Sequence, residues 1–132
     1  MKKTVNLSFV AVSTKYDGMK LTPAILRNLY SAIYCMQPFN RWPMPLPEQV
    51  KFIVDQDEAM GTYLYDDGEK FEHTITISER KCAHLSTVIR VICHEAVHMS
   101  RWKTSKWNHH DSEFRRRTKI VSEELGFDPL EL

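Results

Sequence analysis

The chain has 132 residues, of which 42% are hydrophobic and 27% charged, with a formal net charge of +1 at pH 7. This length and balance predict one globular domain with a modest core, and they exclude a low-complexity or repeat protein. A net charge near zero gives no overall attraction to nucleic acid or membranes, so any such attraction has to be local. No apolar run reaches membrane-spanning length, and three scattered cysteines favour neither a disulfide framework nor a cysteine zinc cluster. The sequence therefore predicts a cytoplasmic chain without membrane partners, and it indicates no particular oligomeric state.

The first half of the chain predicts a strand, a helix and a second strand. Residues 5–12 alternate loosely between apolar and polar positions, which indicates a strand or a segment leading into the first helix. Thr22 followed by Pro23 is a favourable helix start, and apolar residues recur at helical spacing as far as Met36. A segment with four prolines then ends this helix, and residues 49–55 indicate the next strand.

A β-hairpin is predicted in the middle of the chain. Tyr63 and Tyr65 alternate before an Asp-Gly turn at residues 67–68, and apolar residues alternate again over residues 71–77. His73 lies in the second of these strands and is interpreted as an ordinary sheet histidine. The alternative is that this strand forms a sheet edge that holds an extended substrate by main-chain hydrogen bonds.

Two helices are predicted in the last third. Residues 85–101 have one apolar stripe, with Ser86 as the expected N-cap. Asp111 or Ser112 is expected to cap a final helix, and Gly126 stands where a C-terminal cap belongs. The order of elements predicts an α+β domain in which a small, mostly antiparallel sheet packs on helices.

The helix over residues 85–101 contains the motif HExxH. His94 and His98 are four residues apart, so both imidazoles lie on one face and can converge on one metal ion. Glu95 projects beside them and can reach a metal-bound water as a general base. The motif therefore predicts a hydrolytic metal site on this helix.

Two histidines leave a tetrahedral zinc one protein ligand short. Thr104 occupies the position at which the metzincin pattern has its third histidine, which excludes that class. The residues themselves leave four candidates for the third ligand: His109, His110, Glu123 and Glu124.

One further motif resembles a known family. Residues 110–114, HDSEF, resemble the H-G-x-E-F element that follows HExxH in SprT-like zinc metallopeptidases, the family of SprT and Spartan. The resemblance covers about residues 85–125. It implies a minimal zincin-like domain that hydrolyses peptide bonds. The implied site holds one Zn²⁺ per chain, with His94, His98 and His110 as ligands and Glu95 as the catalytic residue.

The chain departs from the family pattern in two respects. Asp111 stands where the family usually has glycine, which puts the local turn in doubt but leaves the ligand in place. Many SprT proteins also carry a four-cysteine zinc ribbon, which this sequence lacks, so residues 1–132 are predicted to form a single catalytic domain. His109 is interpreted as a solvated residue or one that contacts a metal ligand, and the alternative is a replacement ligand or a donor to the transition state. Glu113 is expected to orient a ligand or to favour the N-terminus of the last helix.

Basic and aromatic residues flank the predicted site. Phosphate contact with base stacking is one interpretation, and a solvated surface balanced by acidic residues is the other. Resemblance to DNA-associated proteases favours the first, with protein substrates on or near DNA and single-stranded DNA as a partner. The rival function is a metal-stabilised DNA-binding or interaction module with little hydrolytic activity, for which Glu95 would be unnecessary. The candidate nucleic-acid contacts are Arg101, Trp102, Lys103, Lys106, Trp107, Arg115, Arg116 and Arg117.

Overall fold

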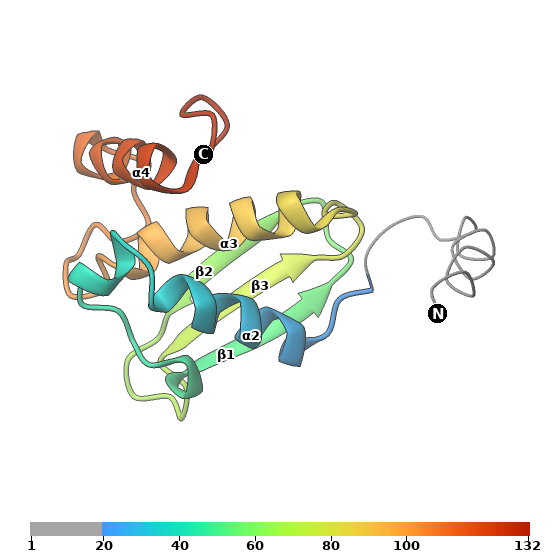
Figure 1. Ribbon diagram of the computed structural model, residues 1–132. Coiled ribbons are helices and arrows are strands. Elements are labelled where there is room, and N and C mark those ends of the chain that lie inside the picture. The colour runs from blue at the N-terminus through green and yellow to red at the C-terminus, as the bar shows by residue number, and fades with distance from the viewer. Residues whose placement is uncertain (1–19) are drawn as a thin grey trace, which may run out of the picture.

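The computed structural model describes residues 20–132, so the strand predicted over residues 5–12 lies outside the described range. The described chain is a small α+β structure, as predicted, with α2 and α3 over one face of a sheet and α4 beyond α3 (Figure 1). Within residues 20–132, no helix is both long and apolar enough to cross a bilayer. The elements in chain order are α2 (Pro23–Tyr34), β1 (Val50–Asp55), β2 (Gly61–Tyr65), β3 (His73–Ser78), α3 (Leu85–Met99) and α4 (Ser112–Leu125), with short 3-10 turns at Phe39–Arg41 and Pro47–Gln49.

The sheet has three strands in the order β1-β3-β2. The predicted hairpin is present, since β2 and β3 pair antiparallel, and Gly68 in its turn has a positive φ of 90°. However, β3 also pairs with β1, and this pair is parallel. The prediction of a mostly antiparallel sheet is therefore wrong. The hairpin reverses the chain, so β3 runs in the direction of β1 and inserts between β1 and β2.

The central position of β3 decides between the two interpretations of His73. Both edges of β3 are hydrogen-bonded within the sheet, so it cannot hold a substrate by strand addition. His73 is buried, and its Nδ1 lies 2.7 Å from the hydroxyl of Tyr63 on the neighbouring strand. It is an ordinary sheet histidine, and the interpretation of its strand as a substrate edge is wrong.

The core lies between the sheet and the two helices that cover it. Phe52, Ile75 and Tyr63 are aligned across β1, β3 and β2, and all three side chains are buried. Tyr30 of α2 and Ile92 of α3 pack into the same core and are fully buried. Each such side chain stabilises the fold by about 1.5–3 kcal/mol relative to an exposed position. This packing fixes α3, and with it HExxH, against the sheet.

Capping residues mark three of the helix ends. Thr22 caps α2 and Asp111 caps α4, each accepting a hydrogen bond from a backbone N–H of the first turn, as predicted. Gly126 ends α4 with a φ of 85°, which suits a residue without a Cβ. The expected cap at Ser86 is wrong, because α3 already begins at Leu85 and His84 is its N-cap.

Gly61 gives a testable prediction about the packing of β2 on α3. A Cβ at this position would lie 2.5 Å from Cγ1 of Val91 and 3.2 Å from Cδ1 of Ile77, and both neighbours are core residues. Gly61→Ala is therefore expected to lower the free energy of unfolding by about 1–3 kcal/mol, measured by urea denaturation. Thr62→Ala, at an exposed position of the same strand, is the control. Equal losses for the two variants would contradict this account.

Candidate metal centre

Three histidines from two parts of the chain meet beside α3. α3 presents His94 and His98 one turn apart, and the segment before α4 brings His110 against them. One ring nitrogen from each lies within 4.8 Å of the others, and Nε2 of His98 and Nε2 of His110 are 3.0 Å apart. Glu123 and Glu124, the acidic candidates for the third ligand, are exposed on α4 and do not belong to this group.

Backbone carbonyls fix the orientation of two of the rings. Nδ1 of His94 lies 2.7 Å from the carbonyl oxygen of Leu132, and Nδ1 of His98 lies 2.7 Å from that of Trp107. A carbonyl oxygen only accepts, so Nδ1 of each ring carries the proton and donates it. The Nε2 lone pairs are then free to bind a metal, which is the usual arrangement of a ligating histidine and its outer partner.

Burial keeps these imidazoles neutral. It lowers the pKa of His94, and it lowers the pKa of His98 to about 4 in spite of the hydrogen bond to Trp107. Neutral imidazole is the form that binds metal, so the site is prepared for a cation near neutral pH. With its proton on Nδ1, the Nε2 of His98 is an acceptor, so its 3.0 Å contact with Nε2 of His110 is satisfied either by a proton on His110 or by a cation shared between the two nitrogens.

The three imidazoles fit a zinc ion. Nitrogens bound to tetrahedral zinc at about 2.0–2.1 Å lie roughly 3.3 Å apart, close to the 3.0 Å between His98 and His110. Three neutral nitrogen donors suit zinc and related divalent transition metals better than magnesium or calcium, which prefer oxygen. A three-histidine set also leaves a fourth coordination position open, as catalytic zinc sites do.

Glu95 follows His94 on α3 and is one of the buried residues of that helix. Its side chain is 6% exposed, and burial raises the pKa of its carboxyl to about 7. The carboxylate has no hydrogen-bond partner among the described residues. It lines a cavity of about 240 Å³ together with His94 and Gly61, at the start of β2. A divalent cation nearby would lower its pKa again, which favours the carboxylate form that a general base requires.

The ring of Phe114 packs against all three histidines of the group. Its ring centroid lies 5.1 Å from that of His94, 4.4 Å from that of His98 and 4.6 Å from that of His110. Phe114 is buried in the first turn of α4 and belongs to the hydrophobic core. It packs on all three imidazoles, and this role was missed because the sequence does not show that α4 returns to α3.

The two candidate outer residues lie away from the ligating atoms. His109 is exposed, and its side chain is not part of the three-histidine group. Glu113 accepts hydrogen bonds from Arg116 and Arg117, which lower the pKa of its carboxyl to about 2. Within the described chain Glu113 therefore pairs with arginines of its own helix and makes no hydrogen bond to a histidine.

The basic residues do not form a single free surface. Arg101 is buried and makes a bidentate ion pair with Asp111, so it is not available for phosphate, contrary to expectation. Arg116 and Arg117 are both paired with Glu113. The exposed basic candidates without an ion-pair partner among residues 20–132 are Lys103, Lys106 and Arg115.

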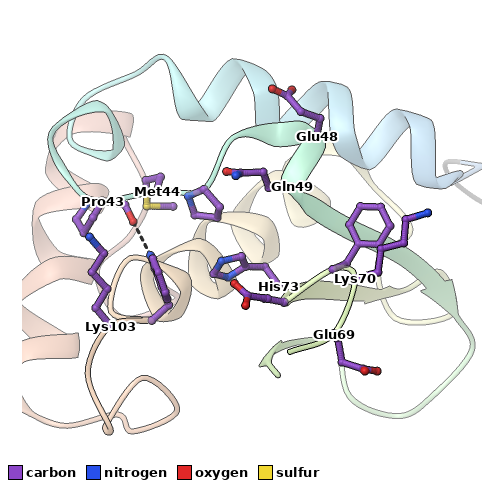
Figure 2. Close-up of a pocket in the computed structure, with 12 residues that line it drawn as sticks. Pro43, Met44, Glu48, Gln49, Glu69, Lys70, His73 and Lys103 are labelled. Carbon is purple, nitrogen blue, oxygen red and sulfur yellow. Dashed lines mark hydrogen bonds between the residues drawn. The ribbon is translucent and has the colours of Figure 1, made fainter. Parts of the chain in front are cut away.

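Trp102 and Lys103 lie in a separate groove of about 740 Å³, which includes none of the three histidines (Figure 2). The indole N–H of Trp102 donates to the carbonyl of Pro43 at 3.0 Å, the dashed line in Figure 2. Its ring meets that of His73 edge to face, and the ammonium of Lys103 lies 5.4 Å from the centre of the indole. Trp102 is therefore partly occupied by contacts inside the protein.

Comparison with known proteins identifies the family of this chain from its sequence. The model of the SprT-like family matches residues 35–130, which include all three histidines and Glu95. Comparisons with curated proteins and with solved structures gave no match. The matched range covers most of the chain, from the end of α2 to beyond α4. The chain belongs to the SprT-like family.

Proposed function

We propose that this protein is a zinc-dependent endopeptidase. The observation that carries the proposal is the position of Glu95, a buried carboxylate that has no hydrogen-bond partner among residues 20–132 and that lines a cavity together with His94 of the three-histidine group. A purely structural metal site has no use for such a group, because burying a carboxylate without a partner is unfavourable. His94, His98 and His110 would hold the metal.

The chemistry follows from the residues around that cavity. A bound zinc supplies Lewis acidity, which polarises a peptide carbonyl and lowers the pKa of water. Glu95 takes the proton from the attacking water and then donates it to the leaving amine. Burial raises the pKa of this carboxyl before any cation binds, and a bound cation would lower it toward the carboxylate form that accepts the proton of water. Phe114 holds the three imidazoles from below and keeps water from that side.

β2 is the strand that we propose to hold the substrate. Among the described residues it pairs only with β3, so its outer edge has no strand partner and could pair with an extended peptide. Its first residue, Gly61, lines the same cavity as His94 and Glu95. A peptide added along β2 would therefore pass the catalytic carboxylate with its backbone held by main-chain hydrogen bonds.

The direct test is cleavage by the purified chain. Casein and a basic DNA-binding protein are incubated with the chain, with and without DNA, and with and without a chelator. We expect cleavage that the chelator abolishes and that added zinc restores. A chain that binds one zinc and cleaves neither protein would favour the alternative, a metal-stabilised binding module.

We also propose that single-stranded DNA binds beside the site. The observation in favour is that Lys106 is exposed without an ion-pair partner in the described chain, next to the half-buried Trp107, whose carbonyl orients His98. Protein bound to the same strand would then lie close to the zinc. The DNA requirement itself is tested by the arms with and without DNA above.

The salt dependence of DNA binding distinguishes the proposed role of Lys106, phosphate contact, from that of Trp107, base stacking. Phosphate contact by Lys106 predicts that Lys106→Ala reduces the slope of log K against log salt by about 0.7 on single strands. Lys51→Ala, an exposed lysine of β1, is the control and should leave the slope unchanged. Trp107→Ala should weaken binding by about 1–3 kcal/mol at every salt concentration if a base stacks there. Absence of salt-dependent binding by the unmodified chain would overturn this second proposal.

A further inference from the structure

The facing ends of α3 and α4 are joined by an ion pair. Arg101, just after the C-cap of α3, donates from Nη1 to Oδ1 of Asp111 at 2.7 Å and from Nη2 to Oδ2 at 2.9 Å. A bidentate pair fixes the direction as well as the distance between a guanidinium and a carboxylate. The arginine is only 6% exposed, so water competes little for it and salt screens it less than a surface pair.

The positions of these two residues in the chain connect the pair to the metal centre. Arg101 lies three residues after His98, and Asp111 directly follows His110. The ion pair therefore joins the chain three residues after one proposed ligand to the residue directly after another. It closes the base of the connecting segment, residues 102–110, and Arg101 also donates to the carbonyl of His109 at 3.4 Å.

Asp111 has a second function in the same place. Its Oδ1 accepts from the backbone N–H of Phe114 at 3.0 Å as well as from Arg101. One carboxylate thus links the end of α3, the start of α4 and the residue whose ring supports all three imidazoles. The glycine that the family usually carries at this position has no side chain for either contact.

We infer that Arg101 and Asp111 are positioning residues for His110, and that their ion pair holds the third imidazole where it meets His94 and His98. Without the pair, residues 102–110 would sample more conformations, and metal binding would have to order them. The expected consequence is weaker metal binding by a chain that is still folded. The inference rests on the proposed metal site and is independent of whether that site hydrolyses peptides.

Zinc affinity is the measurement that tests this inference. Zinc dissociation constants are measured by chelator competition for the unmodified chain, Arg101→Met and Asp111→Asn, at a temperature where circular dichroism shows the metal-free chains folded. Asparagine retains an oxygen that can cap α4, so Asp111→Asn removes the charge pair with little effect on the helix start. We expect about 10–100-fold weaker binding for each variant. We also expect the visible spectrum of the Co²⁺-substituted protein to change.

The double variant and a matched control make the test specific. If the two residues act as a pair, the effects of the two substitutions should not add. The double variant should then bind zinc about as tightly as the single variant with the lower zinc affinity. Arg116→Met removes another ion pair of α4, the exposed one with Glu113 at 2.7 Å, and should leave zinc affinity unchanged.

Two results would overturn the inference, and they differ from each other. If Arg101→Met and Asp111→Asn bind zinc as tightly as the unmodified chain, the pair only stabilises the fold, whatever happens to the melting temperature. If the unmodified chain itself binds no zinc, the metal site is wrong and the inference falls with it.

Discussion

Glu95→Gln is expected to retain zinc and the fold while losing about 10²–10⁴-fold of the rate of peptide hydrolysis, the usual contribution of a positioned acid–base group. Glutamine has nearly the same shape but cannot take a proton from water. This substitution is expected to change little besides the proton transfer, because the Glu95 carboxylate accepts no hydrogen bond from the described residues. Its replacement therefore breaks no network, and burying a neutral amide is easier than burying a carboxylate.

Three measurements define the outcome of this substitution: hydrolysis of a peptide, zinc content by elemental analysis, and the free energy of unfolding. Glu69→Gln, at an exposed glutamate between β2 and β3, is the control and should match the unmodified chain in all three. Loss of zinc in Glu95→Gln would mean that Glu95 has a structural role in the site. Undiminished hydrolysis would show that another group is the base and would remove the argument on which the proposed function depends.

Local sequence signals predicted the helices well. Thr22, Asp111 and Gly126 each act at a helix end through their own side chain or backbone freedom, so a few neighbouring residues carry the information. The HExxH pair is of the same kind, because a spacing of four residues on one helix already places His94 and His98 on one face.

Features that depend on residues far apart in the chain were predicted poorly. The alternation of residues 71–77 predicts a strand but does not say whether it lies at an edge or in the centre, and β3 proved central. Arg101 was grouped with its basic neighbours because its partner, Asp111, lies ten residues away across a turn that no local pattern specifies. A buried arginine and an exposed one look the same in a sequence, and only the path of the chain distinguishes them.

The third ligand shows the same limit. His109 and His110 are adjacent, so no periodicity in the segment before α4 separates them, and their residue type is identical. The resemblance to the family pointed to His110; both histidines are exposed, but only His110 belongs to the three-histidine group, with its Nε2 3.0 Å from that of His98. The cap at Asp111 accounts for the position of His110, because His110 directly precedes the cap and is thereby held against α3.

His110→Ala is therefore expected to remove most of the zinc, whereas His109→Ala should leave about one zinc per chain. Loss of a ligand should weaken binding by more than the roughly 10–100-fold typical of outer residues, because two imidazoles cannot complete the site. Neither substitution touches the Asp111 side chain that caps α4, so both variants should fold, and His109→Ala serves as the matched control. The measurements are elemental analysis after gel filtration and chelator competition. The reverse order of losses would assign the third ligand to His109, and small, equal losses would move it to Glu123 or Glu124. Either result would also contradict the arrangement in which His110 lies against α3 and Phe114 packs on all three imidazoles.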